Sequence, residues 1–139
     1  MSRPKVKLGD VFQIALPDGR FAYGRVYDDA SVGIYSTITT QPYQPPVGSR
    51  DFLFTVAIYS DILENHQWPI INHDPFAPDE SHWPPPYFVR DVIGGDYQIY
   101  HKGVLRPAEP QEIVGLEEAA VYEADHIVDR IMKETGPHF

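Results

Sequence analysis

The sequence predicts an α+β protein, a strongly bent, barrel-like antiparallel sheet with one C-terminal helix packed on it. Apolar side chains alternate with polar ones along short segments of the first 110 residues, which is the period of a half-buried strand. Near the C-terminus the apolar residues recur instead at three- and four-residue spacing, as on one face of a helix. With 42% hydrophobic residues in a chain of 139, we expect one domain spanning residues 1–139.

The first predicted element is a hairpin over residues 6–28. Its Pro-Asp-Gly sequence at 17–19 is typical of a three-residue hairpin loop, because glycine takes the left-handed position. Such a loop pairs Phe12 with Gly24 and Ile14 with Ala22, so bulky side chains lie across from small ones. The opposite face of the hairpin needs partial cover and carries Phe21, Tyr23, Arg25 and Tyr27.

Further strands follow along the chain. Residues 32–40 are β-rich, and the nearly continuous apolar run at 52–59 indicates a central strand covered on both faces. A helical turn is expected at 61–64. The short segment 68–71 contains Pro69, which favours the edge of a sheet because proline has no amide N–H.

The second half begins with a proline-rich segment at 72–86, for which we expect an ordered, extended loop. Short strands are predicted at 88–92, 97–101 and 104–106, with a turn at 94–96.

The C-terminal helix is predicted over residues 116–131. Glu117 and Glu118 suit the positive end of the helix dipole, and Gly136-Pro137 ends the element.

Charge and composition limit the classes of partner. Twenty acidic residues against eleven Lys and Arg give a net charge of −9, so a nucleic-acid partner is not expected. Residues 51–89 hold six acids and no Lys or Arg. This balance favours either simple solubility or a negative surface that attracts a basic protein.

The same composition bears on location. The chain has no cysteine, which excludes disulfides and thiol catalysis and is compatible with a reducing compartment. No apolar run approaches the roughly 20 residues of a membrane span, and no signal-peptide core is recognisable. We therefore expect a cytoplasmic protein without a membrane partner, and the oligomeric state stays open.

The sequence lacks the common catalytic motifs. No nucleophile elbow or phosphate loop is present, so we expect a non-enzyme without cofactors. Ligand-type side chains do gather in the His66–His82 loop, without the spacing of a rigid metal motif. We interpret them as polar loop residues and expect no metal, while a metal-dependent hydrolase stays an alternative. The set is His66, His73, Asp74, Asp79, Glu80 and His82.

Acidic and aromatic residues near this loop suggest a protein-binding surface, because buried aromatics within a charged rim are typical of such sites. A small-molecule or peptide-binding barrel is the alternative use of the aromatics. The predicted partner-binding residues are Asp61, Glu64, Asp74, Asp79, Glu80, Trp83 and Tyr87.

Several motifs, in order, resemble the immunity protein 26 family. They are KLGDVF (7–12), LPDGRFAYGRV (16–26), the Trp-Pro pairs at 68–69 and 83–84, YQIYHKG (97–103), LEEAAVY (116–122) and HIVDRI (126–131). Tyr122 stands where many members have tryptophan. The resemblance implies a bacterial cytoplasmic protein, encoded beside a polymorphic toxin, that protects its own cell by binding that toxin. It implies no catalytic residues. An acidic chain of this kind suits a basic, nuclease-type toxin.

Overall fold

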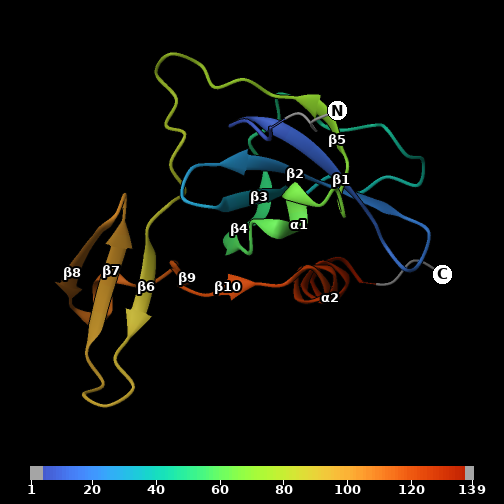
Figure 1. Ribbon diagram of the computed structural model, residues 1–139. Helices are drawn as coiled ribbons and strands as arrows, with labels where there is room; N and C mark the ends of the chain where they lie inside the picture. The colour runs from blue at the N-terminus through green and yellow to red at the C-terminus, as the bar shows by residue number, and fades with distance from the viewer. Residues whose placement is uncertain (1–4, 137–139) are drawn as a thin grey trace.

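The computed structural model describes residues 5–136, which form two β-sheets and two α-helices (Figure 1). The first sheet has the strand order β10-β4-β3-β2-β1-β5, and the second has the order β8-β7-β6-β9. The strands of the first sheet are β1 (Asp10–Ala15), β2 (Phe21–Tyr27), β3 (Ser31–Tyr35), β4 (Phe52–Ile58), β5 (Ile70–His73) and β10 (Val121–Tyr122). Those of the second are β6 (Tyr87–Arg90), β7 (Tyr97–His101), β8 (Val104–Ala108) and β9 (Glu117–Glu118).

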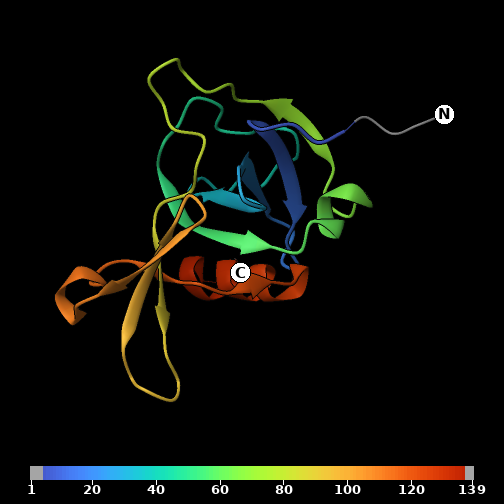
Figure 2. The same ribbon diagram turned by 60° about the vertical axis from the view of Figure 1, so that its left-hand side comes forward.

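The α+β class is confirmed, but the sheet arrangement differs from the single bent sheet that was expected. The edge strands β10 and β5 lie at opposite ends of the first sheet, so no closed barrel forms within residues 5–136. The second sheet instead extends to one side of the first, as both views show (Figures 1 and 2). The helical elements are α1 (Asp61–Glu64), the 3-10 turn η1 (Pro110–Glu112) and α2 (Ala124–Thr135). Neither α1 nor α2 is long and apolar enough to cross a membrane.

The N-terminal hairpin has the predicted register. Phe12 pairs with Gly24 and Ile14 with Ala22. The loop closes where the Leu16 N–H donates to the Arg20 carbonyl at 2.9 Å, with Gly19 at φ 88°. A side chain at Gly24 would overlap the Phe12 ring, so a bulky residue on β1 requires glycine across from it on β2.

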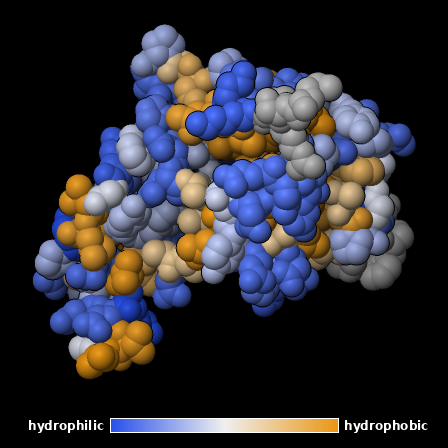
Figure 3. Space-filling model, viewed as in Figure 1, coloured by the Kyte–Doolittle hydropathy of each residue, from blue (hydrophilic) through white to orange (hydrophobic). Residues whose placement is uncertain are grey.

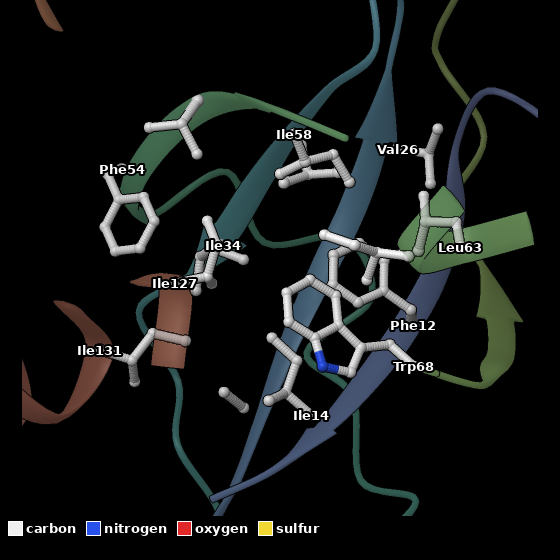
Figure 4. Packing of buried hydrophobic residues seen from close by; sticks show 14 of the residues in the cluster. Phe12, Ile14, Val26, Ile34, Phe54, Ile58, Leu63, Trp68, Ile127 and Ile131 are labelled. Carbon is white, nitrogen blue, oxygen red and sulfur yellow. The ribbon is translucent and has the colours of Figure 1, made fainter. Parts of the chain in front are cut away.

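The main core lies between the first sheet and the two helices (Figure 4). Trp68 stacks on Phe12 with ring centroids 5.3 Å apart and planes 8° from parallel. Helix α2 contributes Ile127 and Ile131, both fully buried and one turn apart. The labelled members from the strands and α1 are Phe12, Ile14, Val26, Ile34, Phe54, Ile58 and Leu63.

The opposite face of the first sheet is covered by loops rather than by a helix. Tyr23 and Arg25 are fully buried there, so the cover that the hairpin required is complete at these positions. The loop after β3 contributes Thr39, whose carbonyl accepts from the Phe21 N–H at 2.7 Å and whose hydroxyl bonds the Tyr23 hydroxyl at 2.8 Å. Strands β1, β2 and β3 are therefore covered on both faces, by helices on one and by irregular chain on the other.

Several other expectations are confirmed, some with the predicted bounds and others with shifted ends. The helical turn α1 and the strand β7 have the predicted bounds, and β5 is an edge strand. Strand β3 ends at Tyr35, short of the predicted residue 40, where its pairing with β4 shifts register between Ile34 and Tyr35. Strand β4 is central, but it alternates buried and half-buried side chains instead of burying both faces.

The start of the C-terminal helix was wrongly predicted. Helix α2 begins at Ala124 and not at residue 116, because the preceding residues pair as strands. Glu117 pairs with Tyr87 of β6, and Val121 pairs with Ala57 of β4, both in parallel register. Long-range pairing therefore overrides the helical period of this segment. Gly136, at φ 72°, follows the last turn as expected, while Pro137 lies outside the described residues.

Candidate functional site

A buried arginine forms the centre of a cluster of charged side chains. Arg25 projects from β2 with no exposed surface. Its Nε donates to the Asp74 carbonyl at 3.0 Å, and one Nη donates to the Pro75 carbonyl at 3.1 Å. Both Nη atoms also donate to the Glu80 carboxylate, at 2.8 and 3.3 Å. The guanidinium lies over the Phe76 ring, 3.8 Å from its centroid.

A second arginine completes this cluster, which we call the ion clamp (Arg25, Arg50, Asp74 and Glu80). Arg50 donates to Asp74 at 2.9 Å and to Glu80 at 2.6 Å. Asp74 is buried and also accepts from the Tyr35 hydroxyl at 2.6 Å and from the Gly48 N–H at 3.1 Å. The clamp therefore joins the sheet to both covering loops.

The protonation states of the clamp follow from these contacts. Hydrogen bonds from Arg25 lower the pKa of Glu80 to about 2, against the opposing effect of its desolvation. Burial alone would raise the pKa of Asp74, but the bonds from Tyr35 and Arg50 lower it below its usual value. The pKa of Tyr35 is raised by burial and by its bond to Asp74. Both carboxylates are thus ionised and paired at neutral pH, which suits a structural role better than proton transfer.

Two of the three histidines of the His66–His82 loop lie against separate carboxylates. The His73 Nδ1 lies 2.8 Å from an Asp10 oxygen, and the His82 Nδ1 lies 3.2 Å from an Asp28 oxygen. With Asp74 and Glu80 in the clamp, four of the six candidate ligands have other contacts. The structure brings together a different trio at the start of α2, Glu123, Asp125 and His126, all exposed and with ligand atoms within 4.8 Å of one another.

An acidic groove lies between α1 and the start of α2, with a volume of about 410 Å³. We call it the α1–α2 groove. Its lining includes the carboxylates of Asp61, Glu123 and Asp125 and no lysine or arginine, so a cationic side chain is the complementary ligand. The full lining is Tyr59, Asp61, Ile62, Gln67, Glu123, Ala124 and Asp125.

The predicted partner-binding residues occupy several different environments. Asp61 lies in the α1–α2 groove, and Glu64 is exposed on the same short helix. Asp79 is exposed on the proline-rich loop, whereas Asp74 and Glu80 belong to the ion clamp. The seven residues therefore do not form one surface.

The two aromatic candidates serve mainly in packing. Trp83 is half-buried, with its ring 5.7 Å from that of His82. Tyr87 is buried, its hydroxyl bonds the Ser31 hydroxyl at 2.9 Å, and burial raises its pKa to about 12. Glu123 and Asp125 were missed as companions of Asp61, because their approach depends on the unpredicted pairing of β10 with β4.

One arginine of α2 fixes the second sheet to the first. Arg130 donates two bonds of 2.8 Å to the Glu117 carboxylate in β9, which raises the arginine pKa. Its guanidinium lies 4.1 Å from the centroid of Phe54 in β4 and donates to the Tyr122 hydroxyl at 3.1 Å. This bidentate ion pair thus links the projecting sheet to the first one, together with the buried bond between the Tyr87 and Ser31 hydroxyls.

Comparison with protein families decides the classification. The family model described as immunity protein 26 matches residues 7–99, two thirds of the chain. The chain belongs to the immunity protein 26 family. No curated protein and no solved structure matches it. The family match covers β1 to β6 and the first part of β7, and it includes all four residues of the ion clamp. The matched range ends before Glu117 and Arg130. Two of the three carboxylates of the α1–α2 groove also lie beyond it.

Proposed function

We propose that the chain is a non-enzymatic bacterial immunity protein that binds and neutralises a cognate polymorphic toxin. The observation that carries this proposal is the match of residues 7–99 to the immunity protein 26 family. The toxin is the product of the gene beside that of this chain, and the complex forms in the bacterial cytoplasm. The whole chain, 1–139, acts as one immunity-type domain in this proposal, supported by the bond between Arg130 and Glu117 that links its two sheets.

The chemistry of the surface favours a basic toxin. The net charge is −9, and the α1–α2 groove places Asp61, Glu123 and Asp125 around one hollow. Enzymes that cleave nucleic acids carry clustered Lys and Arg for the phosphate backbone. A nuclease-type toxin is therefore the complementary partner, and an acidic protein seated on its substrate-binding surface would exclude the nucleic acid.

A growth assay tests this function. Cells that express the neighbouring toxin should stop growing, and co-expression of this chain should restore growth. Neutralising the groove with Asp61→Asn, Glu123→Gln and Asp125→Asn should reduce protection. The matched control neutralises three exposed acids elsewhere, with Asp51→Asn, Glu118→Gln and Asp129→Asn, and should protect as the natural chain does.

The two sets of variants separate the parts of the proposal. Failure of the natural chain to protect would contradict the immunity function. Equal protection by the groove and control variants would support the immunity function and would show that the α1–α2 groove does not contact the toxin.

A second candidate function is supported by a different hollow. A groove of about 420 Å³ lies between the two sheets, lined largely by apolar surface that includes Ile58, Tyr87, Tyr100 and Val121. Its volume falls in the range of small-molecule sites, which favours the alternative of a small-molecule or peptide-binding module. A screen of melting temperature against such ligands tests it, since a ligand that binds the native state raises the melting temperature.

A further inference from the structure

The turn between β6 and β7 exposes two apolar side chains on an ordered loop. The Asp91 N–H donates to the Asp96 carbonyl, and the Gly95 N–H donates to the Asp91 carbonyl, both at 2.8 Å. The Ile93 N–H donates to the Asp91 carboxylate at 3.0 Å. We call residues 91–96 the tip. Its side chains Val92 and Ile93 are 95% and 100% exposed.

This exposure does nothing for the fold. Val92 and Ile93 lie at the far end of the projecting second sheet, where hydrophobic surface is visible in the space-filling view (Figure 3). Turn positions normally carry small or polar residues, and an apolar pair presented on a projection marks an interaction site more often than a structural need. A convex tip of this kind fits a concave apolar pocket.

An acidic hollow lies beside the base of the tip, with a volume of about 360 Å³. Its lining includes Asp91, Asp96 and Glu109 and no lysine or arginine. The carboxylates of Asp91 and Asp96 both lie close to Gly94. Arg90, the residue before the tip, donates to the Tyr97 hydroxyl at 3.0 Å, so the acids outnumber one arginine where the tip begins. A partner that receives the tip therefore meets carboxylates at the rim of the contact, which favours basic side chains there.

Five hollows on the described surface of a second copy of this chain do not supply that chemistry. Each of five hollows on the described surface is lined by at least one carboxylate and by no lysine or arginine. Inserting the tip into such a hollow would bring Asp91 and Asp96 against like charge. Charge complementarity thus points to a different, basic protein.

Pairing through the free edge of β8 is also disfavoured. Strands β7 and β8 are joined by a two-residue turn, Lys102 and Gly103, both with positive φ. In such a hairpin the residues next to the turn, and every second residue after them, bond to the partner strand. Leu105 and Pro107 then face the free edge, where proline offers no N–H. The edge has little capacity to add a strand, so the tip is the better-suited contact.

We propose that the tip inserts Val92 and Ile93 into an apolar pocket of the basic toxin, while the adjacent hollow receives a lysine or arginine from the rim of that pocket. This inference rests on the proposed function and adds to it the location and chemistry of a contact. The partner that fits this surface has an apolar pocket with lysine or arginine at its rim.

Binding measurements with the purified domain of the neighbouring toxin test the proposal. The double variant Val92→Ser/Ile93→Ser removes the apolar groups from positions that contribute no buried surface, so it should fold normally. Loss of two such side chains from a buried contact predicts binding weaker by roughly 100-fold or more. Tyr43→Ser is the matched control, because Tyr43 is a 70% exposed apolar residue on the loop after β3. The control should bind as the natural chain does.

Each outcome has a definite meaning. Weakened binding by the tip variant alone supports the proposal. Equal binding by the natural chain and the tip variant would overturn the proposal and leave the immunity function in place. No binding by the natural chain would overturn both. Sedimentation that shows a self-associated natural chain and a monomeric tip variant would assign the tip to a second copy, which also overturns the proposal.

Discussion

Arg25 and Glu80 lie 55 positions apart in the chain, yet their side chains form a bidentate ion pair with distances of 2.8 and 3.3 Å. The pair joins the middle of β2 to the proline-rich loop. That loop has little regular hydrogen bonding of its own, so its position depends on the fixed charge beneath it. The outer face of the first sheet is thus closed by buried electrostatics as well as by apolar packing.

Replacing Arg25 with methionine should therefore be strongly destabilising. Asp74 would lose the neighbouring positive charge of Arg25. Glu80 would keep Arg50, which is partly exposed, as its one ion-pair partner among the described residues. Removing one partner of a buried ion pair costs about 3–5 kcal/mol of unfolding free energy. Urea denaturation followed by circular dichroism measures this loss.

The matched control is Arg106→Met, which removes an exposed pair with Glu112. An exposed pair contributes at most about 1 kcal/mol, so this variant should change stability little. Equal losses for the two variants would contradict the role assigned to the ion clamp.

The ion clamp also predicts a dependence of stability on pH. The pKa of Glu80 is about 2 in the folded protein, below its ordinary value of 4.5. Its contribution is therefore fully present above pH 4.5 and is lost as the pH falls toward 2. Allowing for partial solvent access, the contribution is roughly 2 kcal/mol.

The variant Glu80→Gln tests this dependence. It should be less stable than the natural chain at pH 7, and the difference should shrink between pH 4.5 and 2. Unfolding free energies measured by denaturation across this range provide the check. A difference between the two chains that stays constant over the whole range would show that Glu80 is not the titrating group.

The pairing of Phe12 with Gly24 predicts that substitutions at these two positions have coupled effects on stability. Gly24→Ala should cost roughly 1–3 kcal/mol, because the new methyl group overlaps the Phe12 ring. Adding Phe12→Leu should recover part of that loss by making room for the methyl group. Thermal denaturation of both single variants and the double variant measures the coupling, and strictly additive losses would argue against the contact.

Arg130 should control how firmly the second sheet is held. Arg130→Met removes both bonds to Glu117, so amide exchange should become faster directly after β9, where the Ala119 N–H donates to the Phe88 carbonyl at 2.8 Å. Glu134→Gln is the control, since Glu134 meets Arg130 only at an exposed position. Unchanged amide exchange in the Arg130 variant would show that this ion pair does not hold the second sheet in place.

Local chemistry explains which elements were predictable from the sequence. The N-terminal hairpin depends on a loop and two adjacent strands, so its register follows from the Pro-Asp-Gly sequence and from alternating side-chain size. The strand β7 and the turn α1 are likewise determined by short segments. The sequence of the hairpin also predicted that the face carrying Tyr23 and Arg25 would be covered by other parts of the chain.

Long-range pairing explains what was missed. Nothing near Glu117 indicates that it pairs beside β6, and its own segment has a helical period. The acidic candidates Asp74 and Glu80 looked like surface charges, because their arginine partners are distant in the chain. The tip was also overlooked, since Val92 was assigned to a strand rather than to the exposed turn that it occupies.

Calorimetric titration of the purified neighbouring toxin domain with this chain tests the central claim most directly. The account predicts a one-to-one complex whose affinity falls as the salt concentration rises, because an acidic surface meets a basic one. Absence of heat and of complex formation at low salt, with both proteins folded, would contradict the assignment of this chain as the inhibitor of that toxin.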